Sequence, residues 1–124
     1  MNARRTIPLS SVLDVTSDAG FELAAAKDQQ GSGKAWRKFI SIDPKGTTFV
    51  MIWKADTGTY ISDNPGYSET FLVFAGTATV TVGSGAPFDI GPGSIVNMPL
   101  RSGMKLKIIT PYRMICTVVL ESSK

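Results

Sequence analysis

The feature that most constrains the fold of this chain is a succession of short strand-like segments that begins after Lys34. Each segment is rich in β-branched or aromatic residues and is bounded by residue types that favour turns. Thr77–Val82 alternates strictly between threonine and a small apolar residue, which is the pattern of a strand with one buried face. Many short strands at regular spacing are typical of a β-sandwich or β-barrel. The sequence therefore predicts an all-β protein.

The expected strands share this composition and follow one another to the end of the chain. They are Trp36–Ile42, Thr47–Ala55, Tyr60–Ile61, Glu69–Gly76, Thr77–Val82, Ser94–Met98, Lys105–Thr110 and Arg113–Glu121. The sequence at Asp43–Gly46 predicts a turn between the first two strands. The last two strands are predicted to form a hairpin, with Pro111 and Tyr112 between them.

The start of the chain lacks this pattern. We expect residues 1–33 to form an N-terminal arm and loop that packs on a barrel made of residues 34–124. A short helical turn is predicted near Ser10–Val15, where a serine can cap it. The periodicity of Phe21–Lys27 does not separate a helical turn from an edge strand, so both stay open. A chain of 124 residues without repeats suits one domain.

Composition excludes several classes of protein. No apolar run reaches the roughly 18 residues of a membrane span. The stretch after Arg4 and Arg5 also lacks the apolar core of a secretory signal. The single cysteine, Cys116, excludes an internal disulfide and suits a reducing compartment. We therefore expect a cytoplasmic protein with no membrane partner and with Cys116 as a small core residue.

Histidine is absent from the sequence, and this absence restricts the chemistry most. It removes Ser-His-Asp and Cys-His catalysis, acid–base work by imidazole, and metal sites that depend on histidine. The net charge of +3, from 13 basic and 10 acidic residues, is too small to argue for nucleic acid. Gly31–Phe39 interleaves cations with aromatic residues but departs from the phosphate-loop motif. We expect no nucleic-acid partner.

Two stretches have glutamate, glycine and proline at the spacing of a known pair of motifs. In the first, six residues separate Glu69 from Gly76. In the second, five residues separate Gly93 from Pro99, and an alternating strand lies between the two stretches. This order resembles the motifs of the cupin superfamily, G-x5-H-x-H-x3,4-E-x6-G and G-x5-P-x-G-x2-H-x3-N. The segment MIWKADTGTY, which begins at Met51, adds a resemblance to the ureidoglycine aminohydrolase-like group, also called the cupin 3 group.

The resemblance implies a single-domain cupin jelly-roll β-barrel, and it identifies the positions at which cupins hold a transition metal with imidazoles and a carboxylate. Ser62 and Asn64 stand at the first two histidine positions, Met104 stands at the third, and Glu69 keeps the glutamate. One carboxylate and neutral oxygens suit at most a weakly held magnesium or calcium ion. We therefore expect no metal and no other cofactor, and we expect these residues to line a plain pocket.

Glu69 is the strongest candidate for chemistry. By the period of two in a strand it shares a face with Phe71 and Val73, and the resemblance makes that face the lumen of the barrel. Burial among apolar walls raises the pKa of a carboxyl and prepares it to act as a general acid or base. The alternative is that Glu69 bonds a neighbouring strand, Arg101 or a lysine and only stabilises the mouth of the barrel.

Three further side chains have both a ligand-binding and a structural interpretation. Trp53 and Tyr60 suit stacking on a planar ligand, and the Tyr60 hydroxyl suits donation of a proton. Ordinary sheet packing is the alternative for both residues. Arg101 lies in a loop of the second motif, where it suits an anion clamp. The alternative is a surface arginine.

Together these residues predict a metal-free cupin enzyme that acts on a small polar or anionic metabolite by proton transfer, as an isomerase, lyase or cyclase. Its predicted catalytic residues are Glu69 and Tyr60. Its predicted substrate-binding residues are Ser62, Asn64, Arg101, Met104 and Trp53. The alternative is a cupin that binds a small molecule without catalysis, as a sensor or accessory module. We expect a homodimer, and a third interpretation is a dimer scaffold that pairs through Trp36–Ile42.

Overall fold

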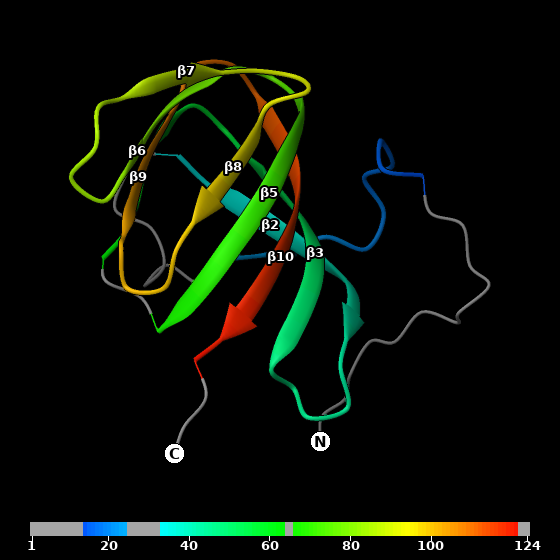
Figure 1. Ribbon diagram of the computed structural model, residues 1–124. Coiled ribbons are helices and arrows are strands. Elements are labelled where there is room, and N and C mark those ends of the chain that lie inside the picture. Colours follow the sequence, from blue (N-terminus) through cyan, green and yellow to red (C-terminus); the bar gives the residue numbers. More distant parts are fainter. Residues whose placement is uncertain (1–13, 25–32, 64–65, 122–124) are drawn as a thin grey trace.

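The computed structural model describes residues 14–24, 33–63 and 66–121, and every regular element in those ranges is a β-strand (Figure 1). The strands are β1 (Glu22–Leu23), β2 (Ala35–Ile42), β3 (Thr48–Ala55), β4 (Gly58–Ser62), β5 (Tyr67–Ala75), β6 (Ala78–Val82), β7 (Phe88–Ile90), β8 (Ile95–Met98), β9 (Met104–Ile108) and β10 (Tyr112–Leu120). The prediction of an all-β protein is confirmed. The described parts of the chain contain no helix long and apolar enough to cross a membrane.

The strands form two antiparallel sheets that face each other around a shared interior (Figure 1). The larger sheet has the order β1-β2-β3-β10-β5-β8, and the smaller has the order β4-β9-β6-β7. The chain crosses between the sheets repeatedly, so that strands adjacent in sequence often lie in different sheets. This is the arrangement of a jelly roll, and the fold class predicted from the sequence is confirmed.

The turn between β2 and β3 shows how the sequence closes a hairpin. The carboxylate of Asp43 accepts hydrogen bonds from the amides of Thr47 and Thr48, at 2.6 and 2.9 Å. Gly46 has a φ of 71°, in the left-handed region that glycine adopts without strain. The predicted turn at Asp43–Gly46 is thus confirmed, together with the pairing of the strands that flank it.

The predicted hairpin between the last two strands is wrong. β9 pairs with β4 and β6, whereas β10 pairs with β3 and β5 in the other sheet. The amide of Ile109 donates to the carbonyl oxygen of Thr77 at 2.9 Å, which holds the end of β9 against the start of β6. Pro111 follows, and because proline has no amide proton it separates the two ladders at the crossing.

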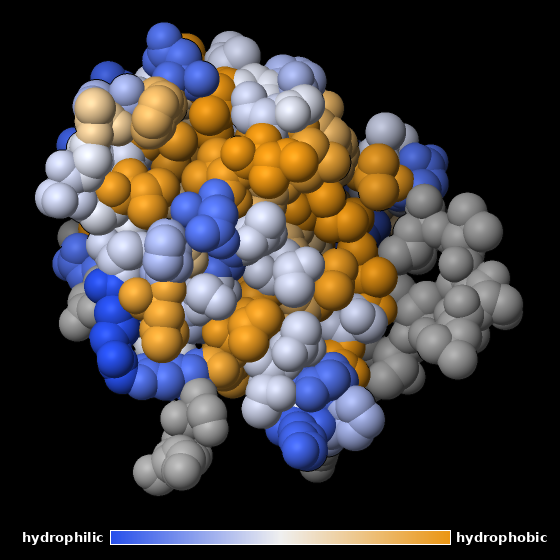
Figure 2. All heavy atoms as spheres, viewed as in Figure 1, coloured by the Kyte–Doolittle hydropathy of each residue, from blue (hydrophilic) through white to orange (hydrophobic). Residues whose placement is uncertain are grey.

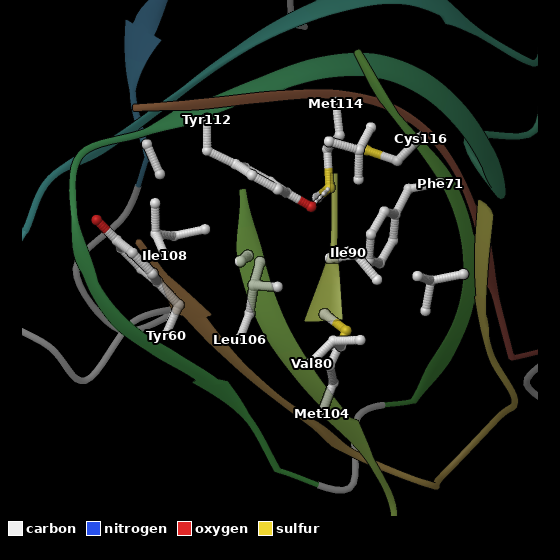
Figure 3. Close-up of a cluster of buried hydrophobic side chains, with 14 of the residues drawn as sticks. Tyr60, Phe71, Val80, Ile90, Met104, Leu106, Ile108, Tyr112, Met114 and Cys116 are labelled. Carbon is white, nitrogen blue, oxygen red and sulfur yellow. Dashed lines mark hydrogen bonds between the residues drawn. The ribbon is translucent and has the colours of Figure 1, made fainter. Parts of the chain in front are cut away.

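The interior is built from alternate residues of the strands. Glu69, Phe71 and Val73 of β5 are buried, whereas Thr70 and Leu72 between them are exposed, as the period of two predicts. Most of the buried side chains come from β5, β6, β9 and β10 and pack together between the sheets (Figure 3). The buried apolar area of this cluster is the main source of the stability of the fold.

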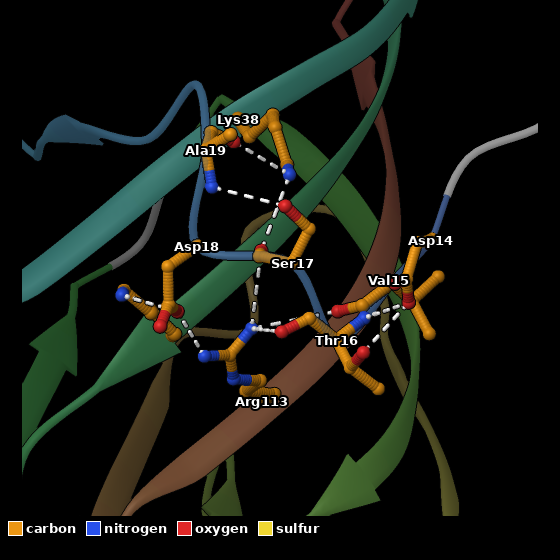
Figure 4. Close-up of polar contacts among 9 residues, drawn as sticks. Asp14, Val15, Thr16, Ser17, Asp18, Ala19, Lys38 and Arg113 are labelled. Carbon is orange, nitrogen blue, oxygen red and sulfur yellow. Dashed lines mark hydrogen bonds and ion pairs between the residues drawn. The ribbon is translucent and has the colours of Figure 1, made fainter.

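Residues 14–21, here called the N-terminal strap, cross the outer face of the larger sheet (Figure 4). Lys38 donates to the carbonyl oxygen of Ala19 at 2.8 Å, and Arg113 reaches the carbonyl oxygens of residues 15–17 at 3.3 to 3.5 Å. Asp18 forms ion pairs with Arg113 and, at 3.1 Å, with Lys54. The three cations of β2, β3 and β10 therefore hold the strap on the sheet.

The aromatic ring of Phe21 adds cation–π contacts between the strap and the sheet. Its ring centroid lies 4.7, 4.5 and 5.7 Å from the cationic groups of Lys38, Lys54 and Arg113. The strap is therefore held on the sheet by ion pairs, by hydrogen bonds to its carbonyl oxygens and by cation–π contacts.

Two predictions concern the start of the chain. Residues 10–13 of the predicted helical turn lie outside the described residues, and Asp14 and Val15 lie at a turn in which Asp14 accepts a hydrogen bond from the Thr16 amide at 3.0 Å. Glu22–Leu23 pairs with β2, which decides for the edge strand. Residues 25–27 of that segment lie outside the described ranges.

The larger sheet also carries an apolar outer surface, which Figure 2 shows as hydrophobic side chains gathered over β3, β10, β5 and β8. Leu72 and Ile95 are opposite each other in neighbouring strands and both are exposed. Exposed apolar surface of this kind is suited to contact with another protein. The homodimer stays a prediction.

Candidate functional site

One end of the interior is hollow, and the cavity there has a volume of about 290 Å³. Its walls come from both sheets and are mostly aromatic, aliphatic or sulfur-containing. The lining residues are Ala24, Arg37, Phe39, Phe49, Met51, Trp53, Tyr60, Ser62, Tyr67, Glu69, Met104, Leu106, Met114, Val118 and Leu120. Only a few polar groups interrupt this apolar surface, as in many small-molecule sites.

Strand register explains why these side chains meet. Arg37, Trp53 and Met114 are opposite one another across β2, β3 and β10 and point to the interior. Two residues further along, the same alternation brings in Phe39 and Met51. The alternation of each strand therefore supplies one row of the cavity wall at a time.

Glu69 is the one buried charged residue among the described residues, with 7 % of its surface exposed. It lies opposite Val118 on β10 and Met98 on β8, so both its cross-strand neighbours are apolar. Burial raises the pKa of its carboxyl to about 7, and the neighbouring Cys116 side chain offsets part of that rise. The ion pairs of the described residues do not include Glu69.

Two further protic groups lie beside Glu69. The thiol of Cys116 donates to the carbonyl oxygen of Met51 at 3.6 Å. The Tyr112 hydroxyl donates to the sulfur of Met114 at 3.3 Å (Figure 3). Burial and, after it, the nearby Glu69 carboxylate raise the pKa of both groups. Both therefore stay protonated at neutral pH, and Glu69 is the group that titrates there.

Polar atoms also lie on the walls. The hydroxyl oxygens of Ser62 and Tyr67 are 3.4 Å apart. The guanidinium of Arg37 lies 5.2 Å from the ring centroid of Phe39 and contacts Glu22 through Nε at 3.3 Å. The site thus combines a buried carboxyl, two hydroxyls and one cation with an apolar wall.

The structure brings together most of the residues predicted from the sequence. Those that line the cavity are Trp53, Tyr60, Ser62, Glu69 and Met104. Asn64 lies outside the described residues. Trp53 contacts Tyr60 edge to face, with ring centroids 5.3 Å apart, so both rings belong to one aromatic wall. Their roles toward a ligand stay predictions.

The Tyr60 hydroxyl does not face the cavity. It lies 3.1 Å from the carbonyl oxygen of Lys34 and 2.9 Å from that of Asp56, within donating distance of both, and Figure 3 shows it pointing out of the buried cluster. Burial, and then the charge of Asp56, raise its pKa. The ring is available to a ligand, whereas the hydroxyl is occupied in holding the start of β2 and the end of β3.

Arg101 is placed away from the cavity wall. It adopts a φ of 64° in the turn after Pro99, where the Ser102 amide donates to the Pro99 carbonyl oxygen at 3.2 Å. Its guanidinium forms an ion pair with Glu121. The structure thus favours the surface interpretation of Arg101 over the anion clamp.

Sequence reasoning missed the cation and several of the aromatic residues of the site. Tyr67 lies two positions before Glu69, so the period of two was sufficient to find it. Arg37 lies two positions before Phe39 in a predicted strand, but the residues around it do not indicate which face of the strand is buried. A bulge after Phe39 shifts the register of β2 against β3, so the alternation of buried and exposed residues is interrupted there.

No protein-family model and no curated protein matches the sequence. Solved structures match the fold. A predicted oxalate decarboxylase from Thermotoga maritima has a TM-score of 0.71 and 11% identity, over 89% of this chain and 99% of that chain. Rru_A2000 from Rhodospirillum rubrum, a cupin-2 domain, has a TM-score of 0.67 and 17% identity, over 86% of this chain and 74% of that chain.

The fold is a cupin fold. An ectoine synthase from P. lautus shares it as well, with a TM-score of 0.64 and 15% identity over 79% of this chain and 72% of that chain. The cupin jelly roll predicted from the motifs is thereby confirmed at the level of the fold. The resemblance to the ureidoglycine aminohydrolase-like group stays a prediction from the motifs.

The residues present do not fit the metal that the cupin resemblance implies. Ser62, Glu69 and Met104 do meet at the cavity, but they supply one carboxylate, one hydroxyl and one thioether. Transition metals favour imidazole or thiolate ligands, and magnesium and calcium need about six or more oxygens. Among the described residues, no group of three or more Cys, Asp or Glu side chains is placed to hold a metal ion.

Proposed function

We propose that this chain binds a small, largely apolar molecule in the cavity and that Glu69 exchanges a proton with it. The observation that carries the proposal is the position of Glu69, a buried carboxyl that lines the cavity with a pKa of about 7. A carboxyl with that pKa is present in both protonation states at neutral pH, so it can accept a proton and return it. Raised carboxyl pKa values of this kind cluster at functional sites.

The cavity walls limit the size and polarity of the molecule. A cavity of about 150 Å³ with apolar walls holds benzene, so a cavity of about 290 Å³ has room for one ring and a short side chain. Aromatic and aliphatic walls favour an apolar body. The walls therefore favour a ligand with a larger apolar part than the small polar or anionic metabolite predicted from the sequence suggests.

The reaction that suits one such carboxyl is the movement of a proton within the bound molecule. The Glu69 carboxylate removes a proton from an acidic carbon of the ligand, for example one next to a carbonyl group. The carboxylic acid that forms then returns the proton to another atom of the ligand, so that Glu69 is unchanged at the end. Cys116 and Tyr112 keep their own protons and fix the surroundings of the carboxyl.

Binding without catalysis is the second candidate. The observation that favours it is the placement of the other predicted groups: the Tyr60 hydroxyl lies against main-chain carbonyl oxygens and Arg101 pairs with Glu121. A protein that only binds its ligand needs no second proton-transfer group, whereas many enzymes use one.

Deuterium exchange separates the two candidates. Cyclohexanone, acetophenone and phenylacetone would be incubated with the protein in D2O, with exchange of their α protons followed by NMR and binding followed by fluorescence. We expect exchange with the native chain, and loss of exchange with retained binding in Glu69→Gln. Binding without exchange would establish the second candidate, and absence of binding by all three ketones would contradict both.

A further inference from the structure

We infer that Arg37 selects the ligand of this cavity by binding a carboxylate, so that the substrate class is small carboxylic acids with an apolar body. The inference rests on the proposed function, because it names the substrate for the site that contains Glu69. It is carried by the position of Arg37, by the two terminal nitrogens of its guanidinium, which make no hydrogen bond within residues 14–24, 33–63 and 66–121, and by the walls between Arg37 and Glu69.

Arg37 stands at the rim of the cavity. It lies on β2 between Glu22 of β1 and Trp53 of β3, and its side chain lines the cavity with Phe39. The side chain is 33% exposed, so the guanidinium reaches both the cavity and the solvent. The guanidinium can therefore contact a molecule in the cavity without leaving the solvent completely.

In the described parts of the chain, the guanidinium of Arg37 has N–H donors that no protein group engages. Its contact with Glu22 runs through Nε alone, at 3.3 Å. Within the described residues, the two terminal nitrogens of Arg37 make no hydrogen bond. Arg113, by contrast, is engaged with Asp18 and with carbonyl oxygens of the strap. Two parallel N–H donors on a planar group match the two oxygens of a carboxylate.

Electrostatics orient the ligand in one direction. A second carboxylate close to Glu69 would be disfavoured, because two like charges in a buried site repel each other strongly. The carboxylate of the ligand therefore stays at Arg37, while its apolar part lies against Phe39, Phe49 and Met51. The remaining end of the ligand points to Glu69, which is where the proton transfer takes place.

Glu22 competes with a ligand carboxylate for the guanidinium of Arg37. It occupies one edge of the Arg37 guanidinium from a strand of two residues, and 40% of its side chain is exposed. A ligand carboxylate adds to the free edge or replaces Glu22. Removal of the Glu22 charge therefore removes a competitor for Arg37 and tightens carboxylate binding.

The test compares phenylacetate with phenylacetone and phenethylamine, which have similar apolar bodies but different charge. Affinities would be measured by calorimetry for the native chain, Arg37→Gln, Glu22→Gln and the control Arg101→Gln. We expect phenylacetate to bind tightest, and Arg37→Gln to weaken it about 10- to 100-fold, the loss typical of a charge-assisted hydrogen bond. We expect phenylacetone affinity to change little in Arg37→Gln. Glu22→Gln should strengthen phenylacetate binding, and Arg101→Gln should leave all affinities unchanged.

Several results would overturn the inference. They are equal affinities for phenylacetate and phenylacetone, equal weakening of both by Arg37→Gln, and no binding of phenylacetate by a native chain that is folded by circular dichroism. The proposed function has a separate readout, since deuterium exchange of the ketones depends on Glu69. Selective carboxylate binding without exchange would support the role of Arg37 and contradict only catalysis.

Discussion

Burial keeps the carboxyl of Glu69 protonated well above the pH at which an exposed glutamate ionises. In the unfolded chain the same carboxyl has its ordinary pKa near 4.5, whereas in the folded protein its pKa is about 7. Between these values the unfolded state releases the proton and the folded state keeps it. The contribution of Glu69 to stability is therefore complete below pH 4.5 and is lost as the pH rises through 7.

We expect the variant Glu69→Gln to lose this pH dependence, because glutamine has a similar size and does not ionise. The shift from 4.5 to about 7 corresponds to about 3 kcal/mol. The free energy of unfolding of the variant, relative to the native chain, should rise by that amount between pH 4.5 and 7 and then level off. Urea denaturation at several pH values measures it. A difference that is flat with pH would show that the carboxyl has the same pKa in both states.

A substitution at Tyr60 separates the role of its hydroxyl group from the role of its aromatic ring. The variant Tyr60→Phe removes the donor to the carbonyl oxygens of Lys34 and Asp56 and keeps the ring in the cavity wall. We expect a loss of about 1 kcal/mol in the free energy of unfolding, with ligand affinity and deuterium exchange unchanged. Loss of exchange at unchanged affinity would instead assign the hydroxyl to catalysis, as the sequence predicts.

At the scale of the elements, the turn from β5 to β6 depends on Gly76. This glycine has a φ of 83°, and a Cβ there would lie 2.1 Å from the carbonyl oxygen of Pro111 and 2.7 Å from the Cα of Tyr112. No side chain fits unless the backbone at the crossing between the sheets moves. The glycine of the first motif is thus explained by close approach of two chain segments.

We expect Gly76→Ala to lower the free energy of unfolding by about 3 kcal/mol or more, because strain and a backbone clash combine. Gly46→Ala is the matched control, since Gly46 has a similar φ of 71° and open space around it. Its cost should be that of the left-handed conformation alone, about 1–2 kcal/mol. Thermal unfolding of both variants checks this, and equal losses would contradict the role of the contact with Pro111.

The N-terminal strap is held by one aromatic ring among three cations. We expect Phe21→Ala to destabilise the protein by about 1–2 kcal/mol through loss of these contacts. Amide exchange should rise in residues 14–23 more than elsewhere. Phe88→Ala is the control, because Phe88 is 64% exposed on β7, and its cost should stay within about 0.5 kcal/mol. Similar exchange in both variants would show that Phe21 does not hold the strap.

At the scale of the whole molecule, the donor set predicts how the protein responds to a chelator. Among the described residues, no three Cys, Asp or Glu side chains are placed to hold a metal ion, and the sequence contains no histidine. We therefore expect calorimetry to give the same Tm with and without EDTA. We also expect mass spectrometry of the purified protein to find transition metal only at the background level, below about a tenth of an equivalent. A full equivalent of metal and a lower Tm after chelation would contradict this expectation.

The fold and the site were predictable from the sequence to different extents. Alternation placed Glu69 on the buried face, and turn residues placed the hairpin at Asp43–Gly46, because both signals are local. The partner of β9 was not predictable in this way, since it depends on which sheet each strand joins. The position of the Tyr60 hydroxyl was equally hidden, because it depends on how β4 packs against the start of β2, and its acceptor on Lys34 lies 26 positions away in the chain. Contacts between distant segments decide what local patterns leave open.

The interior is divided along its length, and this division has a consequence for change by mutation. Val73, Ile108 and Tyr112 fill the packed end, whereas Phe39 and Phe49 line only the hollow end. The first group is needed for folding, and the second group shapes the cavity in which we propose that a ligand binds. A library of variants confined to lining residues outside the buried cluster, such as Phe39 and Phe49, should therefore change the cavity while most of its members still fold. For the same reason, substitutions at these lining residues could change the proposed ligand preference during evolution while the protein keeps its folded structure.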